Sequence, residues 1–252
     1  MKWGRTNIRL PWLVLSVIAT LMIGSHVAAA PGTLADKPLI LETTPVQPNI
    51  FFMVDDSGSM DWEDILNVGT EFPAESAKGF SGLDFSPDNA LEKRLLCRGF
   101  NVMAYDPTVT YEPWAGVDSA GNAYADLTLT TARDNPYSTS TTDISGHVYV
   151  SWKDSDSDGE YDGPGSTDIS SSSSTGDECN IDNPINVSDL SAAEQTNYAN
   201  WYSYYRKREY VAKRALSQII SDSSARVGLG TLHNNNTVLT EVKDIDDISV
   251  PL

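Results

Sequence analysis

Residues 48–60 place a short apolar run directly before a loop of Asp, Ser and Gly, and this transition constrains the fold more than any other feature of the chain. The apolar run, 50–54, has the length of a buried strand, and Pro48 cannot donate a backbone hydrogen bond just ahead of it. The run ends in Asp55-Asp56-Ser57-Gly58-Ser59, which offers oxygen atoms at alternate positions. Because open α/β sheets bind ligands at the carboxyl ends of their strands, we expect a binding loop here.

This loop suits a hard divalent cation. Mg²⁺ and Ca²⁺ take oxygen ligands, and Mg²⁺ keeps part of its water shell. Asp55, Ser57 and Ser59 supply one carboxylate and two hydroxyls from a single short segment. We therefore predict a Mg²⁺ or Ca²⁺ site at these three residues. The competing interpretation is an ordinary polar turn, because Asp, Ser and Gly are common after strands.

The N-terminus has the pattern of a secretory signal peptide. Three basic residues precede an apolar stretch over 10–23, and the small residues 27–30 follow it. The stretch has roughly 14 residues, which is short of the ~20 that a membrane-spanning helix needs. We expect residues 1–29 to be removed and the protein to be exported to the periplasm, outer membrane or cell surface, without a stable membrane span. A retained membrane anchor is the alternative.

The charge of the exported chain excludes one class of partner. Removing residues 1–29 takes away three positive charges and no acid, so the net charge changes from −18 to −21. Nucleic acids are bound through Lys and Arg contacts to phosphates, and a strongly acidic chain does not provide them. We therefore expect no nucleic-acid partner.

Cys97 and Cys179 are the two cysteines of the chain. An even number of cysteines in an exported protein favours a disulfide. The bond would close a loop of about 80 residues and stabilise the fold by about 4–5 kcal/mol on a chain-entropy argument. Free thiols or a zinc site are weaker alternatives, because only His147 and His233 remain once the signal peptide is removed.

The segment after the loop lacks regular periodicity over a long distance. Residues 30–47 are rich in Pro and Thr and predict a linker, whereas 61–187 are rich in aromatic residues, Ser, Asp and Gly. We interpret 61–187 as an insertion with a loose fold of its own. The predicted disulfide would compensate for its small core.

A long helix is predicted after the insertion. Ser191 and Glu194 have the spacing of a capping box, which marks a helix start. Apolar residues then recur at three- and four-residue intervals as far as Ile220, and we expect a break near 206–209. The aromatic half of this apolar stripe is interpreted as core rather than as a binding surface.

Two strands are predicted after this helix. Residues 225–232 form an apolar run that indicates a second strand, and 237–243 alternate like an exposed edge strand. The order of a strand, the insertion, a helix and a hairpin predicts an α/β fold.

The D-x-S-x-S pattern at 55–59 resembles the first metal-binding segment of von Willebrand factor A domains, and the peptides AKRAL and ARVGLGTL resemble the first helix and second strand of that family. The resemblance implies an incomplete von Willebrand factor A-like, Rossmann-type domain, formed by 48–60 and 188–252 and interrupted by the insertion 61–187. It also implies that the two serines bind the ion directly and that Asp55 acts through water.

The family supplies a further threonine and aspartate to its ion from later loops. Residues 244–252 are too short to contain those loops, so we expect the chain to be a fragment with an incomplete metal site.

Three peptides in order resemble the N-terminal region of the PilY family of type IV pilus biogenesis and tip adhesin proteins. They are PNIFFMVDDSGSM, FNVMAYDPTVTYEPW, and NYANWYSYYRKREYVAKRAL followed by RVGLGTL. The resemblance implies a role in pilus assembly, retraction control and surface attachment. Minor pilins and host or surface ligands would be the partners. A secreted A-domain binding protein unrelated to pili is the alternative.

A second acidic loop has part of the pattern of an EF-hand calcium loop. Four aspartates take loop positions 1, 3, 5 and 9 around a glycine at position 6: Asp154, Asp156, Asp158 and Asp162. Position 12 is Gly165 instead of Glu, and no flanking helices are indicated. A weak calcium loop and a solvated acidic loop both remain open.

The sequence does not favour an enzyme. Ser57 lies in D-D-S-G-S rather than in a G-x-S-x-G motif, and no histidine follows at a spacing that predicts a triad. Asp154 and Asp158 have the chemistry of a glycosidase pair, but they lie in a predicted flexible loop. We expect a binding protein, and a metal-dependent hydrolase is the least favoured alternative.

Overall fold

The computed structural model describes residues 46–66, 82–155, 178–233 and 238–244, together with the single residues 157, 159, 161 and 163. The predicted signal peptide and most of the predicted linker lie outside the described residues. From Gln47 onward the chain belongs to one compact unit.

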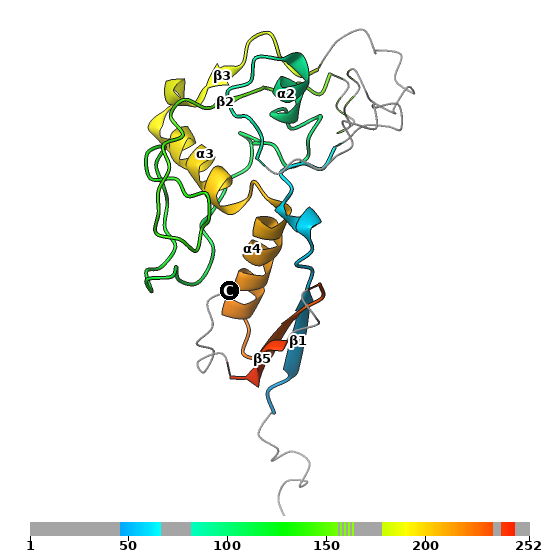
Figure 1. The fold of residues 1–252 in the computed structure, drawn as a ribbon, viewed down its shortest axis with the longest axis vertical. Coiled ribbons are helices and arrows are strands. Elements are labelled where there is room, and N and C mark those ends of the chain that lie inside the picture. Colours follow the sequence, from blue (N-terminus) through cyan, green and yellow to red (C-terminus); the bar gives the residue numbers. More distant parts are fainter. Residues whose placement is uncertain are drawn as a thin grey trace, which may run out of the picture. The chain divides into compact units, whose positions relative to one another are not determined.

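The fold is mixed α/β, with a small mixed sheet, few helices and one disulfide (Figure 1). The elements, in chain order, are β1 (Asn49–Val54), the 3-10 turn η2 (Gly58–Asp61), α2 (Ala90–Leu95), β2 (Val148–Tyr149), β3 (Ile185–Asn186), the 3-10 turn η3 (Val187–Asp189), α3 (Ala192–Tyr204), α4 (Arg208–Ser221), β4 (Arg226–Thr231) and β5 (Val238–Lys243).

The larger sheet has the strand order β1-β4-β5. β1 pairs with β4 in parallel, from Asn49 opposite Arg226 to Val54 opposite Thr231. β5 pairs with β4 antiparallel, with a shift in register near Leu229. The three predicted strands are therefore confirmed, and the chain connects β1 to β4 by a crossover that ends in α4.

The prediction that β1 is a buried strand is wrong. Phe51 is 41% exposed and Met53 is 48% exposed, although the strand is apolar throughout. Both side chains lie over Gly228 and Gly230 of β4. Glycine has no side chain, so β4 places no side chain directly beside either of them on that face.

The predicted capping box is present at the start of α3. The Ser191 hydroxyl accepts the backbone N–H of Glu194, and the Glu194 carboxylate accepts the backbone N–H of Ser191. The predicted break is also present, since α3 ends at Tyr204 and α4 begins at Arg208. Lys207 has an extended backbone between them, so the two helices are separate elements.

The apolar stripe is core in α3 but only partly so in α4. Every residue from Tyr198 to Tyr204 is buried, which confirms the interpretation of the aromatic half. In α4, by contrast, Ile219 is 52% exposed, and the buried positions are Tyr210 and Ser217. A helical segment that is buried all round must be surrounded by chain, and residues of the insertion pack around the second half of α3.

The described parts of the insertion are not loose, contrary to the prediction of a loose fold. Its aromatic side chains and those of α3 form one buried cluster, in which Tyr105 contacts Tyr149, Tyr198 and Trp201 at ring-centroid distances of 5.2, 5.0 and 5.8 Å. Edge-to-face ring pairs add about 0.5–1.5 kcal/mol each beyond area burial. Large aromatic side chains thus build a core without long helices or strands.

Side-chain amides of α3 hold the irregular loops of the insertion. Asn200 accepts the backbone N–H of Leu127 at 3.0 Å and donates to the carbonyl of Tyr111 at 2.9 Å. Asn197 accepts the backbone N–H of Tyr111 at 2.8 Å and donates to Val109 O at the same distance. Loops without a strand partner need such groups, because buried backbone polar atoms must be paired. Figure 1 shows α3 among these loops.

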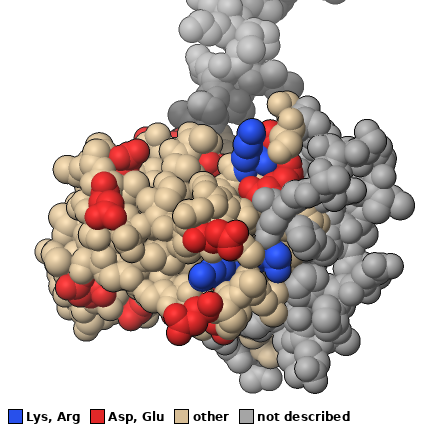
Figure 2. All heavy atoms as spheres, turned by 90° about the horizontal axis from the view of Figure 1, so that it is seen from above, with Lys and Arg blue, Asp and Glu red and all other residues tan. Residues whose placement is uncertain are grey.

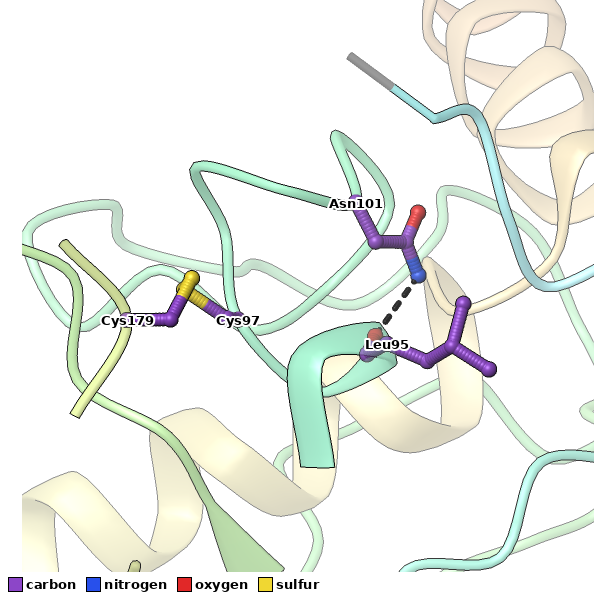
Figure 3. The surroundings of a disulfide bond; sticks show 4 residues. All are labelled: Leu95, Cys97, Asn101 and Cys179. Atoms are coloured by element: carbon purple, nitrogen blue, oxygen red, sulfur yellow. Dashed lines mark hydrogen bonds between the residues drawn. A yellow bond between two sulfur atoms is a disulfide. The ribbon is translucent and has the colours of Figure 1, made fainter. Parts of the chain in front are cut away.

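The Cys97–Cys179 disulfide is present, as predicted, with Cα atoms 5.9 Å apart (Figure 3). It follows α2 directly and lies beside Asn101, which is completely buried. Asn101 donates to the carbonyls of Leu95 (2.8 Å) and Glu63 (3.0 Å). Within the described residues, no helix is both long and apolar enough to cross a membrane.

Candidate functional site

The loops after β1 and β4 begin side by side at the carboxyl ends of these parallel strands. The backbone N–H of Leu232 donates to the carbonyl of Val54 at 3.0 Å, which extends the ladder by one residue. The backbone N–H of His233 then donates to the Asp56 carboxylate at 2.7 Å. The predicted binding loop is therefore held against the loop that follows β4.

The structure brings Ser57 and Ser59 together. Their hydroxyl oxygens are 3.0 Å apart, and both residues are half-buried. The backbone N–H of Ser57 donates to Asp55 Oδ1 at 2.9 Å, so the carboxylate folds back over the start of the loop. The backbone N–H of Met60 donates to the carbonyl of Ser57 at 2.9 Å and begins the turn η2.

The two hydroxyls have a spacing that fits one small cation. Adjacent ligands of an octahedral Mg²⁺, each about 2.1 Å from the ion, are about 3 Å apart. The Ser57–Ser59 oxygen distance of 3.0 Å matches this value without movement of the backbone. In the structure the two hydroxyls hydrogen-bond one another, and rotation of their protons would free both lone pairs for an ion.

The charge at the loop is negative. The backbone N–H of Ser57, followed by its hydroxyl, lowers the pKa of Asp55. Asp55 is exposed and Asp56 is half-buried, so both carboxylates can attract a cation from solvent. The arrangement offers two neutral oxygens beside one anionic group, which is a donor set for Mg²⁺ or Ca²⁺.

The second predicted loop is described only in part. Asp156, Asp158 and Asp162 lie outside the described residues, so calcium binding by this loop stays a prediction. The Asp154 carboxylate accepts the backbone N–H groups of Ser157 (2.6 Å) and Gly159 (2.9 Å). Ser157 and Gly159 have φ values of 66° and 84°, which makes a tight turn around Asp154.

Across the described parts of the chain, no group of three or more His, Cys, Asp or Glu side chains is placed to bind a metal ion. A cation at the end of β1 would depend on the serine hydroxyls and on Asp55. The sequence predicts these residues as ligands because the whole pattern lies within five positions.

Two contacts at the site were not predicted from the sequence. The first is the His233–Asp56 hydrogen bond, which depends on the pairing of β1 with β4. The second is a set of contacts between residues 61–64 and residues 206–208. The complementary charges of D-W-E-D and R-K-R were a visible signal for the second, but the two segments are far apart in the chain.

The chain was compared with protein families, curated proteins and solved structures. No protein-family model matches the chain, and neither a curated protein nor a solved structure shows significant similarity to it.

Proposed function

We propose that this chain acts as an exported, cation-dependent binding protein with a von Willebrand factor A-like domain. The divalent cation would be held by Ser57, Ser59 and Asp55. One observation carries the proposal: two serine hydroxyls lie 3.0 Å apart in a loop at the carboxyl end of a parallel strand pair. That edge is where open α/β sheets bind ligands.

The topology supports the same assignment. β1 and β4 are parallel neighbours, and α4 is the last element of the crossover between them. A strand, a helix and a parallel strand form the repeating unit of Rossmann-type sheets. In this assignment the insertion interrupts the unit between its first strand and its helix.

The expected ligand chemistry follows from the small donor set. Two hydroxyls and one carboxylate fill only part of the coordination shell of Mg²⁺ or Ca²⁺, so an acidic group of a partner can complete it. On the face drawn in Figure 2, Asp and Glu are spread over the described residues, with few Lys and Arg, and the whole chain has a net charge of −18. The positive charge of a cation at the loop would therefore attract an acidic group of a partner to a protein that is itself acidic.

The family resemblance extends this proposal to type IV pili. The peptides at 48–60, 100–114 and 197–232 resemble the PilY family, and they support roles in pilus assembly, retraction control and surface attachment. Minor pilins and surface ligands are the proposed partners. The proposal is for binding rather than catalysis.

The cation site is tested by Mn²⁺ titration followed by electron paramagnetic resonance. Salt at about 0.15 M screens weak binding to the acidic surface. We expect Ser57→Ala and Ser59→Ala each to remove the tightest class of Mn²⁺ sites, because each variant deletes a ligand. Ser188→Ala, at an exposed serine away from the loop, is the matched control. Equal Mn²⁺ binding by wild type and Ser57→Ala would refute the proposed site.

The pilus role is tested in cells that produce the protein from its own gene. We expect the Asp55→Ala/Ser57→Ala double variant to impair twitching motility or attachment while export continues. If this variant matches wild type in piliation, motility and attachment, the cation loop has no part in pilus function.

A further inference from the structure

The chain leaves the cation loop through residues 61–66 and returns toward the sheet through residues 204–208. We call these two segments the junction. The described residues between them, from the insertion to the end of α3, form the aromatic core and its loops. The junction therefore contains both points at which the chain passes between the strand that ends at the cation loop and the aromatic core.

Contacts between the two segments begin at Asp61. Its carboxylate pairs with the ammonium group of Lys207. At the next residue, the carbonyl of Trp62 accepts the backbone N–H of Arg208 at 3.2 Å. The Arg208 guanidinium lies 4.9 Å from the centroid of the Trp62 ring and donates from Nε to the carbonyl of Asp64 at 2.8 Å.

A buried ion pair lies behind these contacts. Arg206 Nε is 2.9 Å from Glu63 Oε1, and both side chains are more than nine-tenths buried. The other Glu63 oxygen accepts the backbone N–H groups of Gly82 (3.1 Å) and Leu83 (2.6 Å). Arg206 also donates to the carbonyls of Tyr202 and Asp134. Because both charges are paired and hydrogen-bonded, the pair holds a defined geometry.

The junction is continuous with the candidate cation ligands. The turn η2 spans Gly58–Asp61 and contains Ser59, and the backbone N–H of Trp62 donates to the carbonyl of Ser59 at 3.4 Å. One end of the cation loop is fixed by β1, and the other end is fixed by Asp61 and Trp62. The position of Ser59 relative to Ser57 therefore depends on where the junction holds these two residues.

We propose that the junction is a positioning device, which holds the loop in the conformation that brings Ser57 and Ser59 to one cation. Lys207 and Asp61 are its positioning residues. Coupling of this kind is reciprocal, so a bound cation would stabilise the junction as much as the junction strengthens cation binding. A partner that moves the aromatic core would then change cation affinity. This inference rests on the proposed cation site.

The test compares Mn²⁺ affinity at the Ser57-dependent site in wild type, Ser57→Ala and variants of the junction, including the double variant Asp61→Asn/Lys207→Met. Lys207→Met and Asp61→Asn remove the ion pair, and Lys207→Arg keeps its charge. Lys213→Met removes a different ion pair, to Glu209, on the same helix, and is the matched control. The Lys207 side chain is 17% exposed and that of Asp61 is 51% exposed, so we expect these variants to fold.

We expect Lys207→Met and Asp61→Asn each to weaken Mn²⁺ binding about two- to fivefold, which is the range of a partly exposed ion pair. The double variant should bind like either single variant, because both delete one interaction. Lys207→Arg and Lys213→Met should bind like wild type. Unfolding midpoints measured without cation separate a loss of affinity from a general loss of stability.

The outcomes separate this inference from the cation site itself. If Ser57→Ala binds Mn²⁺ as wild type does, the site is wrong and the inference falls with it. If Ser57→Ala loses binding while Lys207→Met and Asp61→Asn keep it, the site stands and the junction is only a scaffold. If Lys213→Met weakens binding as much as Lys207→Met, the effect is not specific to the junction and the inference is overturned.

Discussion

The ring of Phe85 stacks on the imidazole of His147, with centroids 4.7 Å apart and planes inclined by 11°. The rings of Tyr198 and Tyr202 approach the imidazole edge-on, at 6.2 and 5.2 Å. Burial among these rings, and then the positive charge of Arg206, lowers the pKa of His147 to about 4. The aromatic core therefore holds a neutral histidine at physiological pH.

This histidine should make stability fall on mild acidification. An unfolded histidine has a pKa of about 6.5, so from there down to the folded pKa of about 4 the unfolded chain binds a proton that the folded chain does not. The free energy of unfolding should drop over this range by on the order of 1–2 kcal/mol, after allowance for partial solvent contact. Below pH 4 this residue adds no further loss.

Urea unfolding of wild type and His147→Gln at several pH values between about 4 and 7.5 checks this prediction, since other titrating groups affect both proteins. Between about pH 6.5 and 4 the free energy of unfolding should fall more for wild type than for His147→Gln. His233→Gln, at an exposed histidine, is the control and should follow wild type. Parallel curves for wild type and His147→Gln would contradict the prediction.

Asn101 should be among the most sensitive positions of the chain. It is fully buried, donates to two carbonyls and accepts the backbone N–H groups of Ile65 and Met103 at 3.0 Å. Asn101→Asp replaces the donor by an acceptor, which leaves two carbonyls unpaired and buries a charge. We expect a loss of about 3 kcal/mol or more in the free energy of unfolding, measured with urea. Asn183→Asp, at an exposed asparagine, should change it by less than about 0.5 kcal/mol.

Gly228 should not tolerate a side chain. A Cβ at this position would lie 2.6 Å from the Phe51 ring and 3.0 Å from a Val242 methyl group. We expect Gly228→Ala to destabilise the sheet by about 1–3 kcal/mol. Adding Phe51→Ala should recover part of this loss, because it removes the closest clash. Gly146→Ala, where the new Cβ would meet no atom within 4 Å, is the control for the glycine change itself. Equal unfolding midpoints for the two alanine variants would show that Phe51 moves aside freely.

Reduction of the disulfide should destabilise the whole aromatic core. Cys97 and Cys179 are 82 positions apart, and both are buried. A loop of this length corresponds to about 4–5 kcal/mol on a chain-entropy argument, which is an upper figure. Thermal unfolding with and without reductant measures the loss. The Cys97→Ala/Cys179→Ala variant should be insensitive to reductant, and wild type that unfolds identically in both conditions would show that the bond adds no stability.

Sequence patterns were sufficient where the structure depends on neighbouring residues. The capping box at Ser191 and Glu194 is local, so it could be predicted. The loop from Asp55 to Ser59 is equally local, and cation binding there stays a prediction. The exposure of Phe51 could not be predicted, because it depends on glycines of a strand far along the chain. The same holds for His233 beside Asp56.

The insertion was misjudged for a related reason. Its core is made by aromatic residues without periodicity, and its loops are held by amides such as Asn200, whose partners lie in irregular segments. The periodicity of a helix or strand in the sequence does not predict contacts of this kind between irregular segments. A high density of Tyr and Trp in both the insertion and α3 was the available signal, and it was interpreted as core only for α3.

The dependence of the insertion on α3 also sets the order in which the chain can fold. The backbone N–H of Tyr111 donates to Asn197, which lies 86 positions later in the chain. The carbonyl of Met103 accepts from Trp201, which lies 98 positions later. As the polypeptide is synthesised, these two backbone groups therefore remain without their α3 partners until residue 204 has emerged. Closing such distant contacts is slow, and apolar surface stays open to aggregation meanwhile. The protein should depend on a chaperone during this interval.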